Sequence, residues 1–107
     1  MILHKDQLAA LMTGNTLYVD IGKDTDAVIY YGADNDAFMR LPGAENVMRG
    51  AWSLRDDGYA VEWQGGPNGE WAIDQEAGRL TYLDGSHEAR GTVSKIVPGD
   101  AEGLAAA

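Results

Sequence analysis

The fold of this chain is decided by residues 13–22, "TGNTLYVDIG", because two periodicities meet there. The residues before this stretch favour a helix over about 5–12, since they are good helix formers and three apolar residues follow the spacing of one helix face. Those three residues are Leu8, Leu11 and Met12. Gly14 then supplies a typical helix stop.

The residues after this stop follow the period of a strand. Leu17, Val19 and Ile21 lie on one face of the segment, while Tyr18 and Asp20 occupy the other. A short helix therefore leads directly into the first strand of a sheet.

The strand pattern then recurs at intervals of about ten residues, and the runs end in turns rich in Gly, Asp, Asn or Pro. The further runs are 27–31, 37–42, 47–54, 59–64, 70–75, 79–84 and 87–97. Connections this short admit only antiparallel neighbours, because a parallel crossover needs about a dozen residues or more.

The predicted architecture is a single, mainly all-β domain over 1–107. It has the short N-terminal helix at about 5–12, strands over about 16–97, and a flexible tail over 98–107 to which we assign no function. An eight-stranded antiparallel up-and-down meander barrel is the preferred arrangement, because closure removes the two unpaired edges of a meander. A six-stranded barrel or an open sheet capped by the helix is the alternative.

Composition and charge limit the partners. The net charge of -9 disfavours nucleic acids and anionic membranes, which are bound through Lys and Arg. The chain has no cysteine, so disulfides and Cys-based metal sites are excluded. The first residues lack a long apolar run and show no signal peptide, so we expect a cytoplasmic protein; a mature form whose leader was trimmed is the alternative.

Motifs that resemble catalytic or metal sites fail on geometry. Ser86, His87 and Glu88 have the residue types of a nucleophilic triad, but consecutive strand residues point to opposite faces. His4 and His87 are the two histidines, and neither lies in a zinc-binding spacing. We therefore expect no catalytic residue, no metal and no cofactor, and an enzyme is the least supported hypothesis.

An aromatic set carries the main functional hypothesis. Five aromatic residues fall on four successive predicted strands and share a face by alternation: Trp52, Tyr59, Trp63, Trp71 and Tyr82. If the barrel closes, they line its interior, which is wide enough either to be filled by side chains or to hold one small ligand. Polar groups near a barrel mouth would come from Arg40, Arg49, Glu62 or Arg90.

Four stretches carry a resemblance to a known family: "LAALMTGNTLYV" (8–19), "YYGADNDAFMR" (30–40), "GAWSLRDDGYAVEWQGG" (50–66) and "GTVSKIVPGDAEGL" (91–104). With them the chain resembles small uncharacterised bacterial proteins of the lipocalin-like (calycin-like) barrel type, related to the domain of unknown function DUF995. The resemblance implies a barrel and names no reaction. Such proteins often carry cysteines where this chain has Ala60 and Glu70, and their absence fits a cytoplasmic protein.

The leading hypothesis is a small non-enzymatic binding protein that holds a small hydrophobic molecule in the barrel. Its candidate ligand-binding residues are the five aromatic residues together with Arg40. The alternative is a protein-interaction module, such as a homodimer, with a fully packed core and an apolar outer face. Tyr18, Tyr30 and Met39 are predicted to lie on that outer face.

Overall fold

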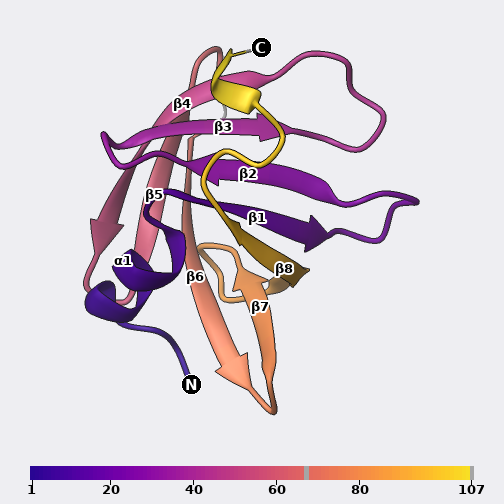
Figure 1. Cartoon of the computed structure of the whole chain (residues 1–107). Helices are drawn as coiled ribbons and strands as arrows, with labels where there is room; N and C mark the ends of the chain where they lie inside the picture. The colour runs from indigo at the N-terminus through magenta and orange to yellow at the C-terminus, as the bar shows by residue number, and fades with distance from the viewer. Residues whose placement is uncertain (67, 107) are drawn as a thin grey trace.

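Eight antiparallel strands form a closed barrel in the computed structural model of the chain, which describes residues 1–66 and 68–106 (Figure 1). The elements are α1 (Lys5–Met12), β1 (Asn15–Asp20), β2 (Ala27–Tyr31), β3 (Asp36–Arg40), β4 (Met48–Arg55), β5 (Gly58–Trp63), β6 (Asn68–Glu76), β7 (Arg79–Leu83), β8 (Ala89–Pro98) and the 3-10 helix η1 (Leu104–Ala106). The prediction of an eight-stranded up-and-down barrel with a short N-terminal helix is confirmed.

The barrel closes through the pairing of its first and last strands. Residues from Asn15 to Asp20 of β1 lie opposite Pro98 to Thr92 of β8, with a register shift after Tyr18. The backbone N–H of Gly99 also donates to the carbonyl of Gly14 at 2.8 Å, which extends the contact beyond the strands. Closure leaves no strand of the meander with an unpaired edge.

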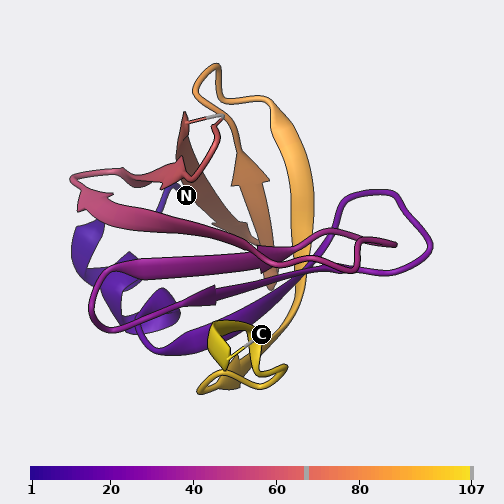
Figure 2. The same ribbon diagram turned by 90° about the horizontal axis from the view of Figure 1, so that it is seen from above.

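The helix α1 closes one end of the barrel. Its Leu8 and Met12 side chains are fully buried and belong to the same apolar cluster as Leu17, Tyr31 and Trp52. Figure 2 shows α1 at one end, while the β1–β2 and β3–β4 connections project from the other. The apolar face that the sequence placed on this helix is therefore used to cover the barrel interior.

Part of the segment predicted as a flexible tail packs against the outside of the barrel. Leu104 is only 1% exposed because it packs on Val28 and Phe38, and Tyr18 and Tyr30 flank this small outer cluster. The sequence prediction missed this packing because one leucine among small residues gives no periodicity.

Polar contacts fix the course of the tail. Thr16 Oγ1 donates to the carbonyl of Gly99 at 2.6 Å and accepts the Ala101 N–H at 3.0 Å. The carboxylate of Glu102 accepts hydrogen bonds from the Tyr18 hydroxyl (2.6 Å) and from Arg40 Nη2 (2.9 Å). The hydrogen bond to Glu102 raises the pKa of Tyr18 to about 12.

We predict that Leu104→Ala destabilises the protein by about 2–4 kcal/mol, because it removes a buried side chain and leaves a gap over Val28 and Phe38. Chemical denaturation measures the change in the free energy of unfolding. Leu41→Ala is the matched control: Leu41 is 40% exposed, so the expected change is within about 0.5 kcal/mol. Equal stability of the Leu104→Ala and wild-type proteins would contradict the packed tail.

Candidate functional site

The barrel interior contains an apolar cavity of about 210 Å³ at the end away from α1. Its lining residues come from all strands except β4: Val19, Ile21, Ala27, Ile29, Tyr31, Met39, Leu41, Tyr59, Val61, Trp63, Trp71, Tyr82 and Arg90. Strand alternation explains the composition, because every second residue of each strand points inward. Ile21 and Leu41 extend the lining past the ends of β1 and β3 to the mouth of the cavity.

Gly50 makes room for the ring of Trp63, one of the aromatic residues of the cavity. Gly50 on β4 pairs with Trp63 on β5, and a Cβ at residue 50 would collide with the Glu62 carbonyl and lie 2.8 Å from the Trp63 ring. No other residue type leaves this space. The ring of Trp63 therefore occupies the space over Gly50 that a side chain at residue 50 would fill.

Three tyrosines meet at the buried part of the cavity. The Tyr31 hydroxyl lies 2.8 Å from the Tyr59 hydroxyl and 2.9 Å from the Tyr82 hydroxyl. The rings of Tyr31 and Tyr59 meet edge to face at 5.5 Å, and those of Tyr59 and Tyr82 at 6.3 Å. All three residues are buried, so the hydrogen bonds form in a region of low dielectric constant.

Burial keeps these hydroxyls protonated. It raises the pKa of Tyr82 to about 12 and the pKa values of Tyr31 and Tyr59 well above the ordinary range. The cause is desolvation, since the phenolate form would lose its hydration without gaining a cation. The trio therefore acts as a set of neutral donors and acceptors.

Arg90 is the charged residue among the described residues that line the cavity. Its Nε donates to Asp84 Oδ2 at 2.7 Å, and its Nη2 lies 3.5 Å from Glu88 Oε2. The hydrogen bond from Arg90 lowers the pKa of Asp84, and backbone N–H groups of Glu88 and Ser86 add to the shift. The guanidinium therefore holds the β7–β8 connection at the mouth.

The structure brings four of the predicted ligand-binding residues together. Tyr59, Trp63, Trp71 and Tyr82 all line the cavity. Trp52 shares their inward direction but lies deeper, where its indole N–H donates to the carbonyl of Gly32 at 3.1 Å.

Arg40 is placed away from the cavity. Its side chain lies on the outside of the barrel, bound to Glu102 of the tail. Of the other residues considered for the mouth, Arg90 takes that place, Glu62 is exposed, and Arg49 stacks over the Phe38 ring at 5.4 Å.

Met39 corrects one prediction, because it points into the barrel rather than outward. The residue beside it, Phe38, takes the outer position beneath Leu104. Tyr31 is the aromatic residue of the cavity lining that the sequence reasoning missed. Its alternation with Ala27 and Ile29 was the available signal, but the whole run 27–31 is apolar or aromatic and showed no contrast between faces.

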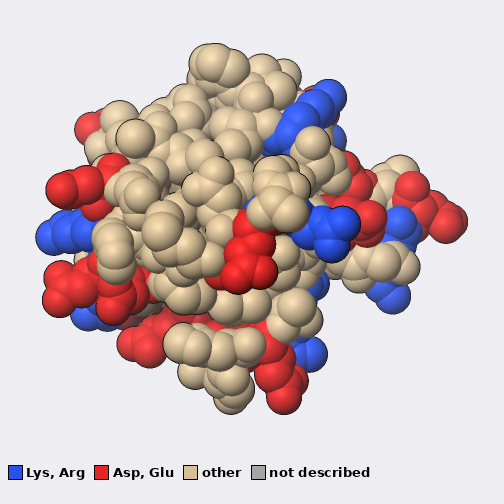
Figure 3. All heavy atoms as spheres, turned by 90° about the horizontal axis from the view of Figure 1, so that it is seen from below, with Lys and Arg blue, Asp and Glu red and all other residues tan. Residues whose placement is uncertain are grey.

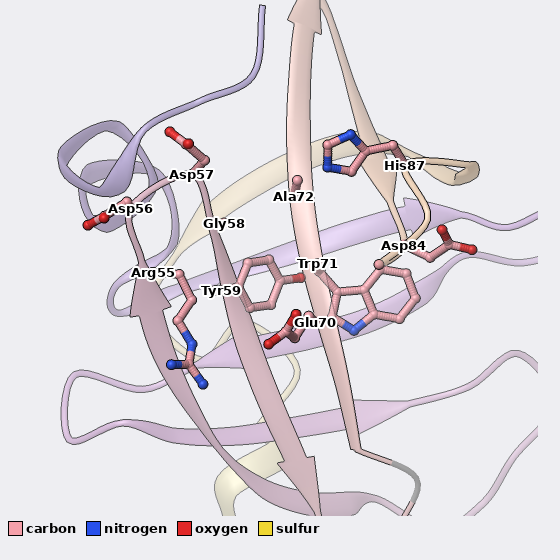
Figure 4. A pocket seen from close by; sticks show the side chains of 11 residues that line it. Arg55, Asp56, Asp57, Gly58, Tyr59, Glu70, Trp71, Ala72, Asp84 and His87 are labelled. Carbon is pink, nitrogen blue, oxygen red and sulfur yellow. The ribbon is translucent and has the colours of Figure 1, made fainter.

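An open groove of about 370 Å³ lies on the outside, between the β4–β5 turn and the β7–β8 connection (Figure 4). Arg55, Glu70 and His87 contribute side chains from three separate elements. His4 Nδ1 and the Asp57 carboxylate, nearby, are paired at 2.8 Å. The groove is open, and its lining is mixed, because Tyr59 and Trp71 contribute to it as well as the charged residues.

Charged side chains are interspersed on the surface, and acidic ones outnumber basic ones on the face that Figure 3 shows. Within the described residues, no three His, Asp or Glu side chains group as metal ligands. None of the helices there has the length and apolar character needed to cross a membrane.

Fold and cavity together define a class of protein: a small closed antiparallel barrel with an apolar cavity towards one end. Comparison with protein family models, curated proteins and solved structures finds no match for this chain. The likeness to lipocalin-like proteins and DUF995 stays a prediction.

Tyrosine burial predicts a loss of stability in alkali. The unfolded chain releases tyrosine protons near pH 10, whereas the native state holds those of Tyr31, Tyr59 and Tyr82 to higher pH. Their contribution to stability is therefore complete below about pH 10 and falls as the pH rises towards 12, by at most about 1.4 kcal/mol per pH unit for each tyrosine.

The measurement is denaturant unfolding at a series of alkaline pH values. We expect the triple variant with Tyr31→Phe, Tyr59→Phe and Tyr82→Phe to lose stability less steeply than the wild-type protein. Lysines titrate equally in both proteins and cancel in the comparison. Parallel curves would show that the three hydroxyls ionise alike in the native and unfolded states.

Proposed function

We propose that this protein is a non-enzymatic binding protein that holds one small hydrophobic molecule inside its barrel. The observation that carries the proposal is the apolar cavity, whose wall includes Trp63, Trp71 and three tyrosines. Ligand sites are typically concave and apolar with few polar groups. Leu41, exposed at the mouth, gives an entering molecule an apolar surface to cross.

The cavity volume sets the size of the ligand. Pockets for drug-sized molecules usually measure about 300–1,000 Å³, and an engineered apolar cavity of about 150 Å³ takes up benzene. A cavity of about 210 Å³ lies between these cases. We therefore propose a molecule of the size of one substituted aromatic ring, or a short branched aliphatic compound.

The cavity chemistry favours binding over catalysis. The described lining offers apolar surface, tyrosine hydroxyls and Arg90, and the guanidinium of Arg90 is already paired with Asp84. The described lining contains no carboxylate or imidazole to act as a general base. Its tyrosines have raised pKa values, which disfavours the phenolate form that a tyrosine base would need.

The alternative of a protein-interaction module rested on the outer aromatic face. There, Tyr18 is bound to Glu102, and Leu104 of the tail packs beside Tyr30. Among the described residues, the large apolar side chains that are exposed are Met1 (57%) and Leu41 (40%), which do not form a broad patch. These contacts favour the cavity as the functional site.

We expect toluene, as a single-ring probe, to shift the tryptophan emission to shorter wavelength in a saturable manner with one-to-one stoichiometry. The physical reason is that the ring displaces water beside Trp63 and Trp71. The expected dissociation constant is on the order of 1 mM or tighter, which corresponds to about −4 kcal/mol.

Two variants locate the bound probe. In Trp63→Phe/Trp71→Phe the remaining Trp52 lies outside the cavity lining, so the emission shift is expected to disappear, whereas Trp52→Phe retains it. Ala27→Leu places extra methyl groups in the cavity and should weaken binding without loss of fold, as checked by thermal melting. Absence of saturable binding to the wild-type protein by both fluorescence and NMR would refute the proposed function.

A further inference from the structure

The tyrosine trio has more hydroxyl protons than well-formed hydrogen bonds. Three O–H groups share two such bonds, and both of these involve Tyr31. The hydroxyls of Tyr59 and Tyr82 also lie close enough to affect each other's pKa, but their contact is weaker than the two hydrogen bonds of Tyr31 at 2.8 and 2.9 Å. Among the described residues, these hydroxyls have no further hydrogen-bond partner.

One proton of the trio, the spare proton, therefore lacks a well-formed hydrogen bond, whichever way the three hydroxyls orient. If Tyr31 accepts from both neighbours, the spare proton is its own; if Tyr31 donates to one neighbour, that neighbour holds it. All three tyrosines line the cavity. The spare O–H thus belongs to a residue that an occupant of the lumen contacts.

This donor is costly to leave without a partner. An unsatisfied polar group away from water forfeits its hydration, and the loss is large in an apolar site. A water molecule can serve as the acceptor in the empty barrel. A purely hydrocarbon ligand that displaces this water leaves the O–H unpaired, whereas a ligand with its own acceptor replaces the lost bond.

We infer that the ligand of the barrel is a small, largely apolar molecule that carries one neutral hydrogen-bond acceptor of the carbonyl type and enters with that oxygen towards Tyr31, Tyr59 and Tyr82. The inference rests on the proposed function, since it names the class of molecule that the cavity holds.

A neutral acceptor fits this site better than a charged one. A carboxylate beside the tyrosines would have to lose its hydration without a cation in contact, and Arg90 at the mouth is already paired with Asp84 and Glu88. A primary or secondary amide would also bring N–H donors, for which the apolar part of the wall offers no acceptor. Ketones, aldehydes and esters carry a carbonyl acceptor and have neither a charge nor an N–H donor.

Acetophenone and isopropylbenzene form the test pair, because they share a shape and differ in a carbonyl oxygen in place of a methyl group. The dissociation constants are measured from the NMR shifts of the Ile29 and Val61 methyl groups, which lie in the cavity wall. The quantity compared is the ratio of the two constants. For each variant, the ratio of the two dissociation constants is compared with the same ratio for the wild-type protein. The difference in hydrophobicity between the two probes contributes to both ratios and therefore cancels.

We expect the triple variant with Tyr31→Phe, Tyr59→Phe and Tyr82→Phe to lose the preference for acetophenone by roughly two- to tenfold, the contribution of one hydrogen bond. Tyr31→Phe alone should keep or increase the preference, because it removes the shared partner of Tyr59 and Tyr82 and leaves their protons available. A merely structural role for the trio would make this central substitution the most damaging. Tyr30→Phe, outside the barrel, is the control and should leave both constants unchanged.

The outcomes separate the inference from the function on which it rests. If neither probe binds the wild-type protein, the proposed function fails. If both bind and the ratio is the same in the wild-type and triple-variant proteins, the protein binds hydrophobic molecules but the inference about the acceptor is overturned.

A second measurement covers the case in which the triple variant does not fold. The infrared stretch of carbonyl-labelled acetophenone bound to the wild-type protein is expected at lower wavenumber than in hexane, because a hydrogen bond weakens the C=O bond. A stretch at the hexane position would overturn the inference without any variant.

Discussion

The pairing of β1 with β8 is the constraint on which the rest of the structure depends. It closes the sheet, and it also brings the two segments that flank the strands to the same end of the barrel, since Asn15 lies opposite Pro98. The chain before Asn15 forms α1 and covers that end from within, while the chain after Pro98 turns along the outside. The opposite end carries the connections 21–26 and 41–47 instead of α1, and the cavity lies towards that end, with Ile21 and Leu41 in its lining.

This arrangement divides the barrel interior into two parts. Near α1, the interior is filled by large side chains such as Leu8, Met12 and Trp52, as in an ordinary protein core. Towards the open end the interior is less filled. The cavity there is lined in part by the small side chain of Ala27, and the ring of Trp63 packs over Gly50. The three tyrosines lie between the two parts, where the hydroxyls of Tyr59 and Tyr82 are each hydrogen-bonded to that of Tyr31.

The architecture was predictable from the sequence because the strand runs are short, regularly spaced and separated by turns that allow only antiparallel connection. The aromatic face was predictable for β5 and β6, where polar residues such as Glu62 and Glu70 alternate with the aromatic ones. In β2 and β3 the alternation is hidden, because the tail adds a second apolar cover. Met39 was therefore assigned to the wrong face, and Tyr31 was overlooked as part of the cavity.

The same cover explains why an apolar sequence on both faces of β2 and β3 does not imply an interface with another protein. Val28 and Phe38 are apolar because Leu104 lies on them, and Arg40 is outside because Glu102 is there to pair with it. The tail of the same chain thus covers the outer face of β2 and β3. The cavity is the remaining feature for which burial of the protein's own side chains gives no explanation. A packed interior would stabilise the barrel further, since filling a void adds dispersion contacts. Moreover, replacing buried hydroxyls together by apolar groups of the same shape costs little or nothing. The open lumen and the tyrosine trio are therefore the two features for which the proposed binding function accounts.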